Sequence, residues 1–403
     1  MSMFSEIIKY NGIKSFIIII ILSLIEYYKC DQGTLKKTIN YKFPNCIELN
    51  NHNILIIFEK GIYLYNSEIS EELNKIEYET GFSLGQDDLN LINLSKFDEG
   101  VVISIIKTYI YLFSETGDKL YHSTLNITGA TYYSLIPHKI EGDNYYFVIS
   151  YKDKDNSNKL KIYYYCINTS DQTINEIKSL EYVHGDSSYE IHHNQGVSCQ
   201  IISPFSSENV LTCFYEVQKS QSANLFLSAS SFILGSTISL DNSIPFIYES
   251  ISAGGPFKSS INSDKTKILI CYSPDNNGGN CIFYNIKNNT FTEDKKYFNK
   301  CSNVAKGIHV DFFSKTKEFI FSCVSGRELT ILKFDENGNA LNLNGSAIDT
   351  NYNFDGYGLF SFSILFLFNN TQYSILYTAN NENCFYYLLP ETFNPSNISN
   401  TNE

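Results

Sequence analysis

Short apolar runs alternate with polar turns along most of the chain. The segment at 268–291, ILICYSPDNNGGNCIFYNIKNNTF, has an apolar run, a turn rich in Asn and Gly, a second apolar run and a second turn. Apolar runs of this length between turn residues predict buried β-strands. Asn and Gly accept the positive φ angles of tight hairpin turns. The segment is therefore predicted to be an antiparallel hairpin with a cysteine on each strand.

The same hairpin pattern recurs along the chain. It is found at 54–69, 101–120, 145–174, 210–230, 268–291, 318–341 and 373–389. The centres of the second strands are separated by about 48–63 residues. A repeat of roughly this length with only strand and turn signals is typical of β-propeller blades, in which stacking buries both faces of each thin sheet.

Further apolar runs supply the remaining strands of such blades. Runs at 199–203, 307–313 and 359–368 precede hairpins and are predicted to be innermost strands, and 176–183 is a predicted outer strand. The last unit lacks an outer strand of its own. The segment at 34–43, which precedes the first unit, is predicted to close the ring there.

The chain as a whole resembles a seven-bladed β-propeller ectodomain. The resemblance implies an all-β fold of four-stranded antiparallel blades at 34–390, after a signal peptide at 1–30 and before a short polar tail at 391–403. It lies in the repeat form alone: Trp is absent, so the WD40 and kelch signatures are missing, and only double glycines recur. A pair of β-sandwiches is the alternative fold.

The N-terminal segment has the features of a secretory signal. Lys9 and Lys14 precede about ten apolar residues at 16–25, whereas a spanning helix needs roughly 20. The prediction is a secreted or cell-surface protein, with an uncleaved anchor or a buried N-terminal helix as alternatives. No later segment has spanning length, because 359–368 is better explained as a buried strand.

Export favours disulfides among the ten cysteines, which contain no C-x-x-C pair. The first two of the following candidate bridges flank turns almost symmetrically, and the last would join the first and last blades. The candidates are Cys199 with Cys213, Cys271 with Cys281, Cys301 with Cys323, and Cys46 with Cys384. Buried thiols are the alternative. Loss of Cys30 with the signal would leave an odd thiol for an intermolecular bridge.

Composition excludes several function classes. The formal net charge of −13 argues against nucleic acid as a partner, because phosphates require a basic surface. A single arginine, Arg327, cannot form the arginine cluster that sialidase-type propellers use on carboxylates. The sequence has no G-x-S-x-G, P-loop or Rossmann motif. We therefore assign no catalytic residue and expect no cofactor.

One histidine-rich segment and several sequons complete the candidate sites. His184, Asp186 and His192 are the candidate ligands of a three-ligand metal site, and a solvated loop between two blades is the preferred interpretation of this segment. Candidate binding-loop residues are Tyr132, Tyr133, His138, His184, His192 and His193, with a third candidate loop at 252–257. Candidate N-glycosylation sites are Asn93, Asn126, Asn168, Asn288, Asn344, Asn369 and Asn397.

The sequence thus predicts a non-enzymatic binding module that uses propeller loop faces for a protein or glycan partner. A secreted hydrolase with paired carboxylates in the axial funnel is one alternative. A disulfide-linked structural scaffold is the other. The sequence leaves the oligomeric state undetermined.

Overall fold

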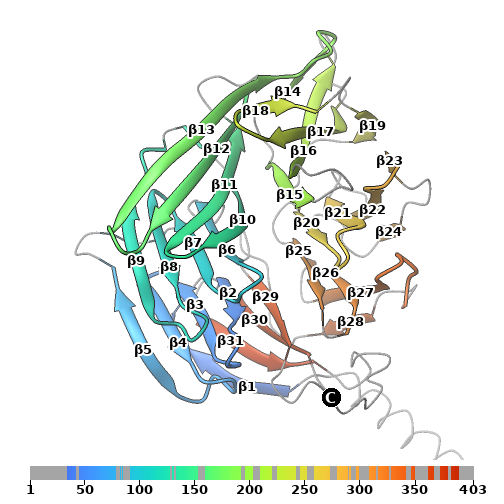
Figure 1. Cartoon of the computed structure of the whole chain (residues 1–403). Coiled ribbons are helices and arrows are strands. Elements are labelled where there is room, and N and C mark those ends of the chain that lie inside the picture. Colours follow the sequence, from blue (N-terminus) through green and yellow to red (C-terminus); the bar gives the residue numbers. More distant parts are fainter. Residues whose placement is uncertain are drawn as a thin grey trace, which may run out of the picture.

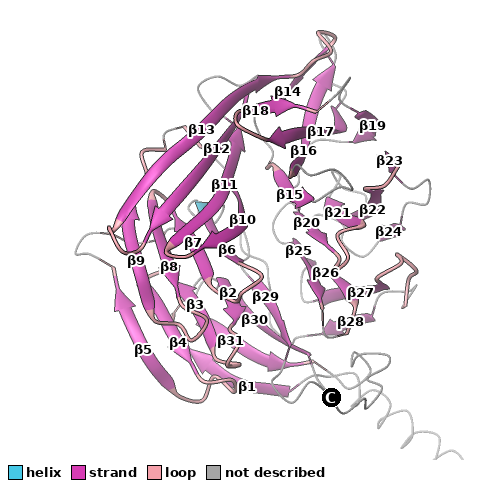
Figure 2. Cartoon of the chain, in the orientation of Figure 1, coloured by secondary structure: helices cyan, strands magenta, loops and turns pink. Residues whose placement is uncertain are grey.

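The structure is a computed structural model. It describes residues 34–389 with gaps at 42–44, 79–81, 83, 85–90, 128, 131–132, 153–158, 192–195, 203–208, 220–224, 242–245, 252–257, 273–278, 289, 292–295, 299–307, 315, 326–327, 342–345, 350–361, 367–372 and 380–382. The predicted signal peptide and the polar tail lie outside the described residues. In the described part of the chain, strands are joined by turns and loops without a helical layer (Figure 2).

The strands form antiparallel sheets that follow one another in chain order. The first contains β2 (Asn45–Glu48), β3 (Ile54–Phe58), β4 (Gly61–Tyr65) and β5 (Glu72–Glu77). The next contains β6 (Ile92–Lys96), β7 (Val102–Ile106), β8 (Tyr109–Phe113) and β9 (Lys119–Thr124). It is followed by a sheet of β10 (Ser134–Glu141), β11 (Asn144–Lys152), β12 (Lys159–Asn168) and β13 (Thr173–Val183).

Two larger sheets come next. One contains β14 (Tyr189–Ile191), β15 (Ser198–Ile202), β16 (Val210–Lys219), β17 (Leu225–Leu234), β18 (Ile238–Leu240) and β19 (Phe246–Ile251). The other contains β20 (Lys258–Ile261), β21 (Lys267–Tyr272), β22 (Gly279–Asn285), β23 (Thr290–Phe291) and β24 (Lys296–Phe298).

Two four-stranded sheets complete the fold. One contains β25 (Ile308–Phe313), β26 (Glu318–Ser325), β27 (Glu328–Asp335) and β28 (Ser346–Asp349). The other has the order β1 (Thr34–Ile39), β31 (Asn383–Leu388), β30 (Tyr373–Ala379) and β29 (Phe362–Phe366).

The first strands of these sheets surround a common axis (Figure 1). Each contacts the next: β2 with β6, β6 with β10, β10 with β15, β15 with β20, β20 with β25, β25 with β29, and β29 with β2. The architecture is therefore an all-β propeller of antiparallel, mostly four-stranded blades. Two sheets carry additional strands on this four-stranded plan: β14 pairs with β16 on the same edge as β15, and β19 and β24 pair with β17 and β22 on the same edges as β18 and β23.

The first described strand closes the last sheet. β1 pairs antiparallel with β31, with Thr34 opposite Leu388 and Ile39 opposite Cys384. Ile39 is buried, and Lys37 Nζ donates a hydrogen bond of 2.6 Å to the carbonyl oxygen of Ile69 in the neighbouring sheet. The prediction that 34–43 supplies the missing outer strand is confirmed for β1.

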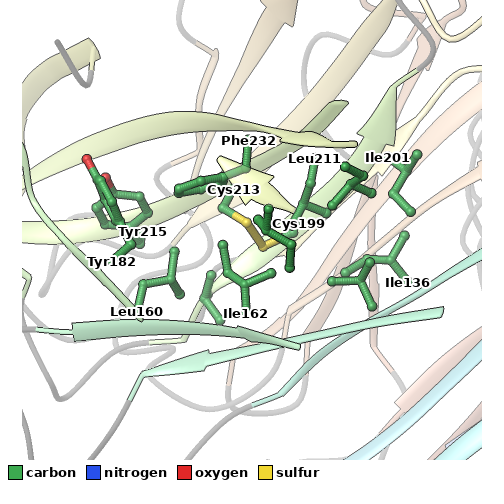
Figure 3. Packing of buried hydrophobic residues seen from close by; sticks show 14 of the residues in the cluster. Ile136, Leu160, Ile162, Tyr182, Cys199, Ile201, Leu211, Cys213, Tyr215 and Phe232 are labelled. Carbon is green, nitrogen blue, oxygen red and sulfur yellow. A yellow bond between two sulfur atoms is a disulfide. The ribbon is translucent and has the colours of Figure 1, made fainter. Parts of the chain in front are cut away.

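Apolar side chains fill the space between neighbouring sheets. Between the β10–β13 and β14–β19 sheets, Ile162 and Leu160 from one side meet Leu211, Tyr215 and Phe232 from the other (Figure 3). The rings of Tyr182 and Phe232 make an edge contact at a centroid distance of 5.0 Å. No sheet could bury both faces alone, so this packing is the main source of stability.

Two predicted cysteine pairs lie at disulfide distance. Cys199 lies directly opposite Cys213 in the β15–β16 pair, and Cys271 lies opposite Cys281 in the β21–β22 pair. Their Cα atoms are 4.0 and 4.2 Å apart, respectively. The near-symmetry of each pair about its turn was therefore a valid signal.

The other predicted bridges remain predictions. Cys46 and Cys384 are both buried in one cluster, which joins β2–β4 of the first sheet to β30 and β31 of the last. Cys30 and Cys301 lie outside the described residues, as does the side chain of Cys323.

Loss of both strand-to-strand bridges should lower stability strongly. Short loops of this size are worth about 3 kcal/mol each in the chain-entropy model. We expect each double variant, Cys199→Ala/Cys213→Ala and Cys271→Ala/Cys281→Ala, to lose about this much free energy of unfolding. The loss would be measured by urea denaturation, as a lower midpoint. A reductant should lower the wild-type midpoint in the same direction. Cys166→Ala is the matched control, because Cys166 is buried outside both bridges and its cost should be independent of reductant.

Candidate functional site

Exposure varies systematically across each blade. The second strands β3 and β7 are buried at every position, whereas the outer strand β5 is almost fully exposed. The innermost strands β20 and β25 have mostly half-buried positions. Solvent therefore reaches the side chains along the axis, where a propeller would place a ligand.

Two neighbouring innermost strands bring polar side chains together at the axis. On β25, Ile308, Val310 and Phe312 pack into the apolar cluster shared with the preceding sheet. Alternate side chains on a strand point to opposite faces, so His309 and Asp311 point away from that cluster. Ser260 of β20 and Lys96 of β6 both act on the carboxyl group of Asp311, and each lowers its pKa.

These contacts define an axial cluster of Lys96, Lys258, Ser260, His309 and Asp311. Its members come from β6, β20 and β25, and the sheet of β6 does not adjoin either of the other two. Because all three are innermost strands, the electrostatic effect of Lys96 on Asp311 is exerted around the axis. Lys96 and Lys258 are exposed, and the other three are half-buried.

The axis is a poorly solvated environment even though water reaches it. Burial raises the pKa of Asp311 to about 6, against the opposing effects of the Phe312 backbone N–H, Lys96 and Ser260. Burial lowers the pKa of His309 to about 4, with a further contribution from Lys258. Burial also lowers the pKa of Lys258, although its side chain is exposed. Protein atoms thus surround these groups closely.

Hydroxyl and amide groups extend the polar surface to β15. Ser198 Oγ and Ser259 Oγ are 2.7 Å apart. Gln200 Nε2 donates to the carbonyl oxygen of Ser259 at 3.0 Å and to its Oγ at 3.1 Å. These groups fix the spacing of β15 and β20 beside the axial cluster.

Turns from separate blades meet at one end of the axis. Lys265, in the β20–β21 turn, forms an ion pair with Asp98 in the β6–β7 turn, with Nζ and Oδ2 3.4 Å apart. Lys96 Nζ donates to the carbonyl oxygen of Glu48 at 3.2 Å. The Lys265–Asp98 pair joins sheets that are not neighbours, so it reaches across this end of the axis.

The described binding-loop candidates Tyr133, His138 and His184 are not members of the axial cluster, although His138 lies on the innermost strand β10 and Lys265 is among the groups that lower its pKa. Tyr133 is buried, and its carbonyl oxygen accepts a 2.8 Å hydrogen bond from Asn93 Nδ2. His138 is half-buried, with its Nδ1 2.8 Å from the hydroxyl of Tyr164. Burial lowers the pKa of His138 to about 4. Tyr132 and the loop at 252–257 lie outside the described residues.

The histidine-rich segment has a structural environment where it is described. His184 is buried, with Nδ1 3.1 Å from the Asp186 carbonyl oxygen and Nε2 3.3 Å from Ser228 Oγ. His192 and His193 lie outside the described residues. Within the described ranges, no group of three or more His, Cys, Asp or Glu side chains could hold a metal ion.

The described sequons differ in their surroundings. Asn126 and Asn288 are exposed in connecting segments. Asn93 and Asn168 are half-buried, and the Asn168 side chain bonds to Asn144 and to the backbone N–H of Asp171. Asn344, Asn369 and Asn397 lie outside the described residues. Glycosylation therefore remains a prediction, best placed at Asn126 and Asn288.

The sequence interpretation missed every member of the axial cluster. The signal was the alternation in IHVDFF, in which polar His309 and Asp311 sit two residues apart among apolar residues. That alternation marks one polar face of a strand. It does not reveal that Lys96, more than two hundred residues earlier, approaches the same face.

The fold defines the class of protein: an all-β propeller closed by its first described strand. No family model matches the chain, and no curated protein matches it. Similar solved structures include a mutant of AofleA from Arthrobotrys oligospora, with 12% identity, a TM-score of 0.46 and coverage of 77% of this chain and 88% of that chain. The WD40 domain of SCAP from fission yeast has 8% identity, a TM-score of 0.42 and coverage of 89% and 94%. The AfRom2 CNH domain has 8% identity, a TM-score of 0.42 and coverage of 89% and 97%.

These similarities are too low to transfer a function to the chain. The propeller assignment rests on the sheets themselves. The described residues contain no helix that is long and apolar enough to cross a membrane.

Proposed function

We propose that the chain is a non-enzymatic binding module, a seven-bladed propeller that acts outside the cell on a protein or glycan partner. The sheet order and the contacts among the innermost strands support the blade number. The two cysteine pairs at disulfide distance and the apolar segment at 16–25 support export.

One observation supports the binding function most directly. Solvent-accessible polar side chains on the innermost strands line the axis, and the strands next to them in each sheet are buried. Such a preformed polar surface on rigid strands loses little entropy when a ligand binds. The turn that holds Asp98 and the turn that holds Lys265 add charged groups at one end of this surface.

Hydrolysis and scaffolding have weaker support. A carboxylate-based hydrolase needs two carboxyl groups flanking the scissile bond. The interactions of Asp311 instead involve Ser260, the Phe312 N–H and Lys96. Scaffolding through an intermolecular disulfide needs an accessible thiol, and the unpaired cysteines whose side chains the structure describes, Cys46, Cys166 and Cys384, are buried.

A retention experiment with charge-reversed variants tests the binding function. The full-length secreted protein would be immobilised and offered a glycan array and a library of extracellular proteins. We expect Lys96→Glu/Lys265→Glu to abolish retention of the wild-type partner, because both lysines lie at the axis. Lys75→Glu/Lys287→Glu, on the outer strand β5 and an exposed turn, is the matched control and should retain it.

If Lys75→Glu/Lys287→Glu lost the partner while Lys96→Glu/Lys265→Glu retained it, the binding surface would lie on the outer strands and the axial site would be refuted. Failure of the full chain to leave the cell behind its own first 30 residues would refute the extracellular location.

A further inference from the structure

The outermost strand of the third sheet, β13, has a long edge that pairs with no other described strand. β13 has eleven residues, whereas the outer strands β5 and β9 have six each. It lies on the outer side of its sheet (Figure 1), and β12 is its one partner among the described strands. A strand edge of this kind presents backbone N–H and C=O groups that can pair with a further strand.

The exposed apolar side chains of β13 indicate that this edge is an interaction surface. Ile177 is 51% exposed and Val183 is 55% exposed, the two highest values among the large apolar side chains that the structure describes. No other described strand has two such side chains exposed. Single exposed apolar residues are ordinary, but a long edge strand with several of them favours association with another strand.

The half of β13 that ends at Val183 is regular. From Lys178 to Val183, each residue lies opposite one residue of β12, and the bulge lies before this segment. Alternate side chains point to opposite faces of a strand. Leu180 and Tyr182 pack against the β14–β19 sheet. The other face presents exposed side chains: Ser179, Glu181 and Val183.

This segment is complementary to a second copy of itself. In an antiparallel pair of identical strands, a two-fold axis passes through one residue and side chains of the same face lie opposite one another. With the two-fold at Leu180, Ile177 of each copy lies opposite Val183 of the other, and Leu180 lies opposite its own copy. The most exposed apolar side chains of the described chain would then cover one another.

Charge favours this register over the neighbouring ones. With the two-fold at Leu180, Glu181 lies opposite Ser179 of the other copy. A two-fold at Glu181 or at Lys178 would place like charges directly opposite each other, which is destabilising. A two-fold at Ser179 would place Ile177 opposite the carboxylate of Glu181.

We propose that two copies of the chain associate through their β13 edges, with the two-fold at Leu180. The contact joins two four-stranded sheets into one sheet that runs through the dimer. It goes beyond the binding function proposed above and does not depend on it, since the axial cluster lies on the innermost strands.

Analytical ultracentrifugation of the full-length protein over a range of concentrations tests the association. We expect a monomer–dimer equilibrium that Ile177→Lys/Val183→Lys weakens at least about a hundredfold, because the buried apolar contacts are lost and lysines face each other instead. Leu73→Lys is the matched control: Leu73 is 45% exposed on the outer strand β5, so the equilibrium should not change. All three proteins should unfold at the same temperature when dilute enough to be monomeric.

Engineered cysteines test the register. Leu180→Cys places two thiols directly opposite each other across the two-fold, at a separation that a disulfide can span. We expect covalent dimers of this variant on mild oxidation, above the wild-type background. Val183→Cys is the control, because its two copies would lie about 20 Å apart along the paired strands and should not be linked.

Four outcomes would overturn the proposal. The first is a wild-type protein that stays monomeric at every concentration, and the second is a dimer that Ile177→Lys/Val183→Lys leaves intact. Cross-linking of Val183→Cys as efficient as that of Leu180→Cys would contradict the register. If a monomeric wild type formed dimers after deletion of residues 391–403, the edge would be assigned to the tail of the same chain. The retention experiment above decides the axial binding surface separately.

Discussion

Removal of β1 is expected to unfold the propeller at a markedly lower denaturant concentration. β1 supplies the outer strand of the last sheet through its pairing with β31, and it buries Ile39 between the first and last sheets. Each net hydrogen bond contributes about 1 kcal/mol and a buried Ile about 2 kcal/mol. Deletion of residues 34–39 should therefore cost at least about 5 kcal/mol, a large part of the stability of a typical domain.

Chemical denaturation and amide hydrogen exchange would measure this effect. The amides of β31 that pair with β1 should lose protection first, and a synthetic peptide of residues 34–41 should restore it. Lys36→Ala is the control, because Lys36 is exposed on β1 and its loss should change stability by less than about 0.5 kcal/mol. An unchanged midpoint in the deletion variant would mean that the ring is held closed without this strand.

Replacement of Glu318 by Ala is expected to be the most destabilising single substitution at a blade interface. Glu318 begins β26 and is buried beside Lys333 of β27, with Oε1 and Nζ 3.8 Å apart. Tyr373, from the last sheet, donates a 2.8 Å hydrogen bond to Glu318 Oε2, and its hydroxyl lies 3.0 Å from Thr316 Oγ1. Burial lowers the pKa of Lys333, and Glu318 acts in the opposite direction.

Loss of the Glu318 carboxylate should cost about 3–5 kcal/mol, because Lys333 would keep a buried charge without this partner. Thermal unfolding of the double variant Glu318→Leu/Lys333→Met provides the sharp comparison. Removing both charges should recover most of the loss. Glu141→Ala, which breaks the exposed Lys139–Glu141 pair, should cost no more than about 1 kcal/mol. If the double variant were as unstable as Glu318→Ala, the uncompensated charge would not be the cause.

The hairpins could be predicted from the sequence because their signals are local. The apolar runs on either side of SPDNNGG became β21 and β22, and the same reasoning located β3 with β4 and β30 with β31. The two cysteine pairs followed from equal distances to a turn, which fixes the register of a hairpin. Predictions of this kind depend only on residues that are close in sequence.

Longer-range features could not be predicted in the same way. β14 has three residues, and its partner β16 lies about thirty residues away, so local periodicity does not detect it. The Lys265–Asp98 ion pair joins residues 167 positions apart in the sequence. The axial cluster was missed for the same reason: each strand showed its polar residues, but only the order of the blades brings Lys96 near Asp311.

The pairing of β1 with β31 also has a practical consequence for protein engineering. Thr34 lies opposite Leu388, so both ends of the described fold are side by side in one sheet. A short flexible peptide could connect them, and the polypeptide could be opened instead at an exposed turn such as the one at 170–172 between β12 and β13. A circular permutant of this kind would keep every blade while moving the cut to another part of the ring.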